Sequence, residues 1–505
     1  MSKKSQKLII ILFLVFGIAA GFWYFLWSYK TGGGIDGAAK CKDCNLIMIS
    51  LSNISAEHMS LYGYERLTTP NLDQWAKDAV VFENAFTQTS WTLPVATSLF
   101  TSLYPYSHRV MDRFIDNILD ENIKTLPEIL RDQGYKTAAF TGGLDYSNSF
   151  GHMRGFEDLD EAADFYTAME FAGFGPSLDK AASWLKENKN EKFFLFIHGY
   201  DAHCPFDPPQ HLRGAFSTTT GKNITVDSKL CLRGFKNSEG ETYEAYSYRQ
   251  GPEKVLLTQD DINYLEDLYD EEILSVDALV GNFLNKLDKT ISGNTIIVVF
   301  SDHGEMFAKH GRFGRAGGIR GTLYDDVIHV PLIIKTPFLK EKLVNGLVQI
   351  IDIMPTLLNI LDLPQPKQTQ GKDLLALING EKKEINKYVF AGSKFGFPEA
   401  YPVFEIFPLK SIAESVRSKE WKLIHEIILD EKGEAKEEAY ELYDFENDPG
   451  ELRNLAQELP DIIKELKDVL KRWKEEAESY KTQNVSSPQL LPQEIIDAAK
   501  QHGYW

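Results

Sequence analysis

The chain has 505 residues, of which 43% are hydrophobic and 25% charged. This composition is typical of a folded protein with one large domain and a smaller one, and it excludes large-scale disorder. The formal charge of −19 repels nucleic acid and anionic lipid headgroups, so we expect no nucleic-acid partner. An anionic substrate would need local cations in order to bind.

The N-terminal segment is the first element along the chain. Three lysines precede an uncharged run at residues 8–27, which is long enough to cross a bilayer as a helix. Positive charge before the run and aromatic residues at its far end predict a single-pass membrane protein with its N-terminus inside and its body periplasmic or extracellular. The alternative is a cleaved signal peptide, but the run is longer than a usual signal-peptide core and no convincing small-x-small cleavage site lies directly after it. We therefore expect an uncleaved anchor at residues 1–30 and a Gly-rich tether at residues 31–44.

The four cysteines suit an oxidising compartment. Cys41 and Cys44 lie close together, and Cys204 and Cys231 flank a loop-like segment. A Cys-x-x-Cys spacing is also found in half of a zinc site or in a redox pair. Since no second Cys-x-x-Cys or paired histidine lies nearby, we expect one or two structural disulfides, whose pairing stays open.

Short apolar runs alternate with amphipathic segments after the tether. The runs are typical of buried strands and lie at residues 46–51, 136–140, 193–198, 295–300 and 331–334. Amphipathic segments such as residues 126–133 lie between them. This alternation predicts an α/β domain at residues 45–380, with a mostly parallel sheet flanked by helices.

The C-terminal part has a different pattern. Strand-like pieces at residues 420–428 and 439–443 precede an amphipathic helix at residues 461–473. We expect a smaller α+β subdomain at residues 381–481. A tail at residues 482–505 starts as a Pro-broken linker and ends in a short helix.

The polar residues that follow each predicted strand are the candidates for a functional site. In open parallel sheets, ligands bind beyond the carboxyl ends of the strands. The residues at these ends are Ser52 and Asn53, Thr141 to Gly143, Asp201 and His203, and Asp302 and His303. Polar groups from distant parts of the chain are therefore expected to meet at one edge of the sheet.

Several segments resemble the sulfatase family, part of the alkaline-phosphatase superfamily. They occur in the family's order and are NLIMISLSNISAEHMSLYGY, SWTLPVATSLFTSLYP, FFLFIHGYDAHCPFDPP, IIVVFSDHGEMFAKHG and ELYDFENDPGELRNLA. The resemblance extends from Asn45 to the C-terminus. It implies a sulfatase-like α/β fold, a divalent cation, usually Ca²⁺, and hydrolysis of a sulfate or phosphate ester at the edge of the sheet.

The metal-ligand positions of the family are only partly retained. Asp302 and His303 match the second pair of ligands, and a carboxylate with an imidazole can share a cation. The alternative for Asp302 is a strand-end residue that caps a turn. Ser52 and Asn53 occupy positions where the family has one or two aspartates. Their neutral side chains predict weak or lost metal binding, and they can also serve simply to satisfy a strand-to-helix turn.

The nucleophile position holds Thr92. Sulfatases oxidise a Cys or Ser to formylglycine in a C-x-P-S-R pattern, and the stretch here is Thr-Leu-Pro-Val-Ala. Threonine carries a methyl group on its carbinol carbon and cannot form the aldehyde, which excludes a formylglycine mechanism. Thr92 could attack directly, as threonine does in other members of the superfamily, or it could be an ordinary helix N-cap.

Two further positions resemble groups that bind the substrate. His203 matches the family histidine that contacts the transferred group or the leaving oxygen, and a loop histidine bonded to backbone is the alternative. Arg320 lies near a family lysine that binds sulfate oxygens, with an exposed loop arginine as the alternative. A further family lysine is replaced here by Gly143.

Three functions remain open at this stage. The first is a metal-dependent hydrolase of sulfate or phosphate esters that uses Thr92. The second is a catalytically inactive binding module with the same fold, and the third is a membrane-linked phosphoryl-group transferase. The expected substrate is an anionic ester on a sulfated or phosphorylated glycan or lipid headgroup, and the expected membrane contact is the N-terminal helix.

Overall fold

A computed structural model describes residues 40–111, 118–160, 173–217, 224–228, 230–236, 240, 242–247, 254–290, 293–314, 323–395, 410–430 and 434–480. Its centre is an eight-stranded sheet of order β12-β2-β11-β9-β1-β5-β3-β4. The strands are β1 Asn45–Leu51, β2 Val80–Phe86, β3 Lys136–Phe140, β4 Asp158–Asp160, β5 Phe193–Gly199, β9 Thr295–Phe300, β11 Leu332–Lys335 and β12 Lys342–Gln349. The five apolar runs expected to be strands all lie in this sheet.

The central strands run parallel and are buried on both faces. All residues of β1, β5 and β9 are buried, as expected for the middle of a parallel sheet. Strand β1 pairs in parallel with β9 and β5. Only β11 runs against its neighbours β9 and β2. The predicted fold class, a mostly parallel α/β sheet with a smaller C-terminal subdomain, is confirmed.

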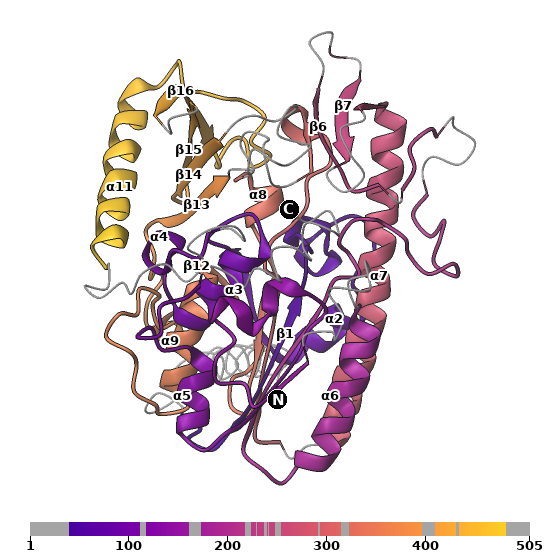
Figure 1. The fold of residues 1–505 in the computed structure, drawn as a ribbon, viewed down its shortest axis with the longest axis vertical. Coiled ribbons are helices and arrows are strands. Elements are labelled where there is room, and N and C mark those ends of the chain that lie inside the picture. Colours follow the sequence, from indigo (N-terminus) through magenta and orange to yellow (C-terminus); the bar gives the residue numbers. More distant parts are fainter. Residues whose placement is uncertain are drawn as a thin grey trace, which may run out of the picture.

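Helices cover both faces of the sheet (Figure 1). The helices of the described residues are α2 Pro70–Trp75, α3 Thr92–Thr101, α4 Pro105–His108, α5 Leu126–Asp132, α6 Phe174–Asn188, α7 Gln259–Thr290, α8 Asp325–Ile328, α9 Ile353–Ile360, α10 Leu375–Ile378 and α11 Pro460–Ser479. Ile47 and Ile49 of β1 share a core with α6 and α7. Leu46 and Met48 point to the other face and share a core with α3, α5 and α9.

Helix α5 illustrates how local sequence defines an element. The side chain of Thr125 accepts a hydrogen bond from Glu128 N at 3.3 Å, and Glu128 Oε2 accepts one from Thr125 N at 3.0 Å. This capping box satisfies two backbone donors at the start of the helix. Pro127 lies in the first turn, where its missing N–H costs nothing.

A four-stranded antiparallel sheet forms the C-terminal part. Its strands, in spatial order, are β13 Val389–Phe395, β14 Lys410–Arg417, β15 Trp421–Leu429 and β16 Ala435–Asp444. Helix α11 packs on it through Leu466, Leu470 and Trp473, and Tyr104 of the main domain joins the same core. The expected helix at residues 461–473 is confirmed and extends further at its C-terminal end.

A second small sheet was not expected from the sequence. It has the order β10-β6-β7-β8 and consists of β6 Leu232–Lys236, β7 Tyr243–Ser247, β8 Lys254–Leu257 and β10 Arg312–Phe313. These strands are short and lack a long apolar run, so their pairing depends on tertiary contacts rather than on local pattern.

The four cysteines form two disulfides, Cys41–Cys44 and Cys204–Cys231. The expectation of disulfides is confirmed, and in this paired state Cys41 and Cys44 are bonded to each other and do not act as zinc ligands. The second disulfide ties the loop after β5 to the segment that leads into β6.

The predicted single-pass membrane topology requires correction. Among the residues that the structure describes, no helix is both long and apolar enough to cross a bilayer. The apolar run on which the prediction rested, with its anchor at residues 1–30, lies outside the described residues. The predicted localisation is therefore unsupported and is not carried further. The predicted tail at residues 482–505 also lies outside the described residues.

A buried charge cluster joins the main domain to the C-terminal sheet. Lys422 Nζ lies 2.7 Å from Asp325 Oδ1 and 2.7 Å from Glu451 Oε1, and Arg417 Nε lies 3.1 Å from Asp325 Oδ2. Burial opposes ionisation of Asp325, but Lys422 and Arg417 outweigh it and lower its pKa below the ordinary value. Helix α8 is thereby tied to β14 and β15.

Replacing Lys422 by Met is expected to lower the free energy of unfolding by about 3–5 kcal/mol, because it leaves Asp325 buried with only Arg417 for charge compensation. Urea denaturation measures the change. The exposed neighbour Lys419 provides the control, since its replacement by Met should change stability by less than about 0.5 kcal/mol. Equal unfolding midpoints for both variants would show that the cluster does not stabilise the junction.

Candidate active site

The loops after β1 and β9 meet at the carboxyl edge of the sheet. The backbone N–H of Asn53 donates to Asp302 Oδ1 at 3.1 Å, and that of Ile54 donates to Ser301 Oγ at 3.0 Å. Asn53 has φ 69°, a left-handed conformation that asparagine adopts more readily than most residues. This turn brings both predicted metal loops together.

Thr92 is hydrogen-bonded to His303. The distance from Thr92 Oγ1 to His303 Nε2 is 3.3 Å, and His303 Nδ1 lies 3.0 Å from Gly304 O. Because a carbonyl oxygen can only accept, Nδ1 donates to it, and Nε2 is the ring atom that faces the Thr92 hydroxyl. The N-cap of α3 is Trp91 and Thr92 is the first helical residue, so the N-cap alternative for Thr92 is wrong.

The position of Thr92 at the N-terminus of α3 has an electrostatic consequence. The helix has ten residues, and its first backbone N–H groups carry partial positive charge. An anionic group next to the Thr92 hydroxyl would therefore be stabilised. The arrangement places a hydroxyl, an imidazole and a helix N-terminus at one point.

The predicted metal-ligand residues fit a divalent cation. Ser52, Asn53, Asp302 and His303 are almost completely buried, and Ser52 Oγ and Asn53 Oδ1 have no hydrogen-bond partner. Buried oxygen atoms without partners are costly unless another group, such as a cation, binds them. His303 Nε2 lies 3.6 Å from Asp302 Oδ2 and 3.3 Å from Thr92 Oγ1. Such separations suit neighbouring ligands of one cation.

The ligand set carries less negative charge than a hard cation prefers. Asp302 is its only carboxylate, and hydroxyl, amide and imidazole groups supply the other donor atoms. The sequence predicted this depletion of charge. It did not predict that Glu305, three residues after Asp302, accepts a hydrogen bond from Asn53 Nδ2 at 3.0 Å. The sequence feature that could have indicated this contact was Glu305 itself, an additional acidic residue in the loop after β9.

His203 lies in the loop after β5, which contacts the site through its backbone. Asn53 Nδ2 donates to Ala202 O at 3.1 Å, and His203 Nδ1 lies 2.7 Å from Cys204 O. Asp201 in the same loop accepts from Phe174 N at 2.6 Å and so caps α6. Arg320, the predicted anion-binding residue, lies outside the described residues.

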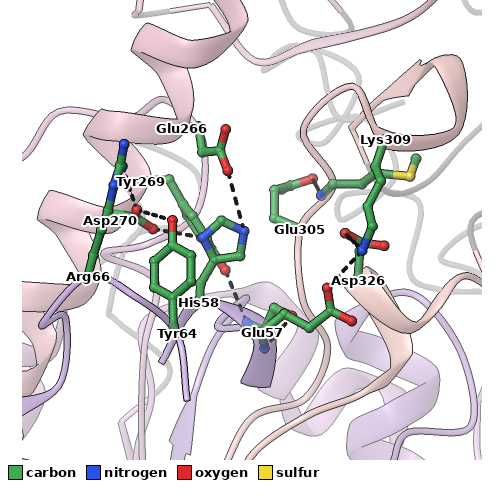
Figure 2. Close-up of polar contacts among 12 residues, drawn as sticks. Glu57, His58, Tyr64, Arg66, Glu266, Tyr269, Asp270, Glu305, Lys309 and Asp326 are labelled. Atoms are coloured by element: carbon green, nitrogen blue, oxygen red, sulfur yellow. Dashed lines mark hydrogen bonds and ion pairs between the residues drawn. The ribbon is translucent and has the colours of Figure 1, made fainter. Parts of the chain in front are cut away.

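Two ion-pair clusters hold the segment that follows Asn53 (Figure 2). His58 Nδ1 lies 2.7 Å from Asp270 Oδ1, and Arg66 Nη1 lies 2.7 Å from Asp270 Oδ2. Lys309 Nζ lies 2.9 Å from Glu57 Oε2 and 3.1 Å from an oxygen of Asp326. The segment after β1, which contains the predicted metal ligands Ser52 and Asn53, is thus fixed to α7 on one side and to the loop after β9 on the other.

Tyr269 of α7 fixes the turn itself. Its hydroxyl donates to Asn53 O and accepts from Ser55 N at 3.1 Å. The sequence did not indicate Tyr269, because its role depends on the packing of α7 against the loop. A rigid turn keeps the side chains of Ser52 and Asn53 in place.

A second group of possible metal ligands consists of His310, Asp326 and Glu451, whose donor atoms lie close together. Lys309 already pairs with Asp326, and Lys422 already pairs with Glu451. A cation would add positive charge where these lysines already balance the carboxylates. We interpret this group as structural.

Comparisons with known proteins show the family and the fold. The family model "Sulfatase" matches residues 45–363, and the model "N-sulphoglucosamine sulphohydrolase, C-terminal" matches residues 318–476. Delta 4,5-hexuronate-2-O-sulfatase from Bacteroides thetaiotaomicron is 24% identical over 432 residues, which cover 82% of this chain and 85% of that protein.

Two solved structures are similar in fold. One is a protein in complex with its substrate D-glucosamine-2-N,6-O-disulfate, with a TM-score of 0.65, 19% identity, and coverage of 88% of this chain and 99% of that chain. The other is the phosphonate monoester hydrolase of Agrobacterium radiobacter, with a TM-score of 0.64, 20% identity, and coverage of 86% and 95%.

The His58 contact predicts a pH-dependent stability. Burial alone would lower the pKa of His58, but the Asp270 carboxylate outweighs it and raises the pKa above the ordinary value. A raised histidine pKa stabilises the fold fully below about pH 6.5, and this contribution is lost as pH rises through the folded-state pKa. Replacing His58 by Gln should therefore cost about 2 kcal/mol at pH 6 and less at higher pH.

Denaturation of the parent and the His58→Gln variant between pH 6 and 9 measures this difference. The exposed His211 provides the control, because its replacement by Gln removes no buried ion pair. A stability difference for His58→Gln that stays constant over this range would contradict the assignment of a charged His58–Asp270 pair.

Proposed function

The chain belongs to the sulfatase family, and we propose that it is a cation-dependent hydrolase of sulfate or phosphate esters in which Thr92 is the nucleophile. The observation that carries this proposal is the 3.3 Å contact between Thr92 Oγ1 and His303 Nε2 at the N-terminus of α3. It joins the candidate nucleophile to a candidate metal ligand. Formylglycine chemistry is excluded, because threonine cannot give the aldehyde.

The proposed reaction has two steps. The Thr92 hydroxyl loses its proton to solvent and its oxygen bonds to the sulfur or phosphorus atom while the bond to the ester oxygen breaks, and the ester oxygen leaves as an alcohol after taking up a proton. Water then attacks the same atom, which releases the sulfate or phosphate anion and returns a proton to Thr92. Two features oppose this reaction: the Thr92 hydroxyl must lose its proton, and the transferred group carries negative charge. A bound divalent cation would lower the pKa of the hydroxyl and stabilise that charge.

The residues of this chain supply the remaining requirements. Ser52, Asn53, Asp302 and His303 would hold the cation, and Ca²⁺ suits a set in which oxygen donors outnumber the single nitrogen. The α3 N-terminus stabilises the transferred anion. His203 is proposed to contact the leaving oxygen. Arg320 is proposed as the further cation that binds the anionic group.

The proposed substrate is a sulfated or phosphorylated glycan. The hexuronate sulfatase and the disulfated glucosamine complex support a sugar ester, and the phosphonate monoester hydrolase supports phosphorus chemistry on this fold. A threonine nucleophile favours phosphate over sulfate, because the family's sulfate chemistry depends on formylglycine. The overall negative charge of the chain makes local positive charge at the site essential.

Replacing Thr92 by Val is expected to lower turnover at least about 10³-fold, since it removes the attacking hydroxyl while keeping the shape. Thr92→Ser should retain measurable turnover, because the hydroxyl remains. Turnover is measured with an aryl sulfate and an aryl phosphodiester, with added Ca²⁺ and after chelation. Thr101 at the other end of α3, whose Oγ1 donates to Thr97 O at 2.7 Å, provides the control variant Thr101→Val.

The outcomes separate the candidate functions. Turnover that needs Ca²⁺ and disappears in Thr92→Val but not in Thr101→Val supports the hydrolase. Unchanged turnover in Thr92→Val excludes Thr92 as the nucleophile. A parent protein that turns over neither substrate and binds no Ca²⁺ would instead be a binding module with the sulfatase fold.

A further inference from the structure

The orientation of the Asn53 amide is determined by its partners. Asn53 Nδ2 donates to Ala202 O at 3.1 Å and to Glu305 Oε2 at 3.0 Å. Both partners are oxygen acceptors, so a flipped amide would place its oxygen against two other oxygens. The two amide hydrogens are therefore used, and Oδ1 lies at the other end of the group, buried and without a hydrogen-bond partner.

Glu305 is held in place by its own loop. It is buried, and its Oε1 accepts from Met306 N at 3.3 Å. A Cβ on the preceding residue, Gly304, would lie 2.2 Å from Asp326 O and 2.9 Å from Ser55 Cβ. The backbone between His303 and Glu305 is thus packed too closely to shift. The carboxylate stays beside Asn53.

We propose that Glu305 is a positioning residue that turns Asn53 Oδ1 toward the cation site and supplies, next to that site, the negative charge that the first metal loop lacks. A hydrogen bond to a carboxylate polarises the amide and makes its oxygen a better donor for a cation. The negative charge that an aspartate at position 53 would carry is thus carried by Glu305 instead. This inference rests on the proposed function for the cation itself, and it assigns a role to Glu305 that the proposed reaction does not require.

The first experiment measures cation affinity. Glu305→Gln keeps the size of the side chain but removes its negative charge, and Gln can donate as well as accept, so that Ala202 O is the only remaining partner that must accept from Asn53 Nδ2. Ca²⁺ affinity of the full chain, measured by equilibrium dialysis, should fall about 10- to 100-fold. Glu128→Gln is the matched control, because Glu128 is a buried glutamate that accepts from Thr125 N at 3.0 Å and does not contact Asn53.

The second experiment exchanges the two groups and needs no cation. Asn53→Asp alone places two buried carboxylates about 3 Å apart, so the melting temperature of the chelated protein should fall by about 5 °C. In the double variant Asn53→Asp with Glu305→Gln, the new amide donates to the new carboxylate. Part of the melting temperature should return, and Ca²⁺ affinity should equal or exceed that of the parent.

Each result decides the proposal. Reduced Ca²⁺ affinity in Glu305→Gln but not in Glu128→Gln, with compensation in the double variant, supports it. Parental affinity in Glu305→Gln, or melting-temperature changes that simply add, overturns it. Failure of the proposed function appears separately, as unchanged turnover in Thr92→Val, while the exchange experiment still reports on the Asn53–Glu305 pair.

Discussion

The parallel pairing of β1 with β9 is the constraint on which the site depends. Its register places Asn45 beside Thr295 and Ser50 beside Phe300, so that both strands end at the same edge. A slip of one residue would turn every side chain of β1 to the opposite face and would separate Asn53 from Asp302. Burial of alternating residues by two different helix layers prevents that slip, and so the packing of the core determines the geometry of the polar loops.

Sequence alone could predict the central strands because each is a continuous apolar run. The expected bounds of β3 and β9 match those in the structure. Strand β2 was missed because Glu83 and Asn84 interrupt its apolar pattern at partly buried positions. The antiparallel direction of β11 could not be predicted either, because a short apolar run carries no information about strand direction.

The candidate site, like the sheet, could be predicted only in part. Strand ends indicated which loops would meet, and the resemblance indicated Thr92, Asp302 and His303 within them. The contacts of Glu305 and Tyr269 could not be predicted, since they depend on side-chain orientation in the folded state. Ser52 and Asn53 carry no charge, so the sequence predicted too little negative charge in the loop after β1. The acidic residue that contacts Asn53, Glu305, lies in the loop after β9.

This arrangement bears on how an acidic protein can bind an anion. Negative charge at Asp302 and Glu305 attracts a cation, but it also repels an anionic ester if no cation is bound. The ion pairs of Lys309 with Glu57 and Asp326 keep that lysine engaged in holding the loops. In the proposed site, attraction for the substrate would come from the cation and from the N-terminus of α3, which both act at the Thr92 hydroxyl, and from Arg320. Binding and attack would then depend on the same ion, so an anion would be held where the nucleophile is activated.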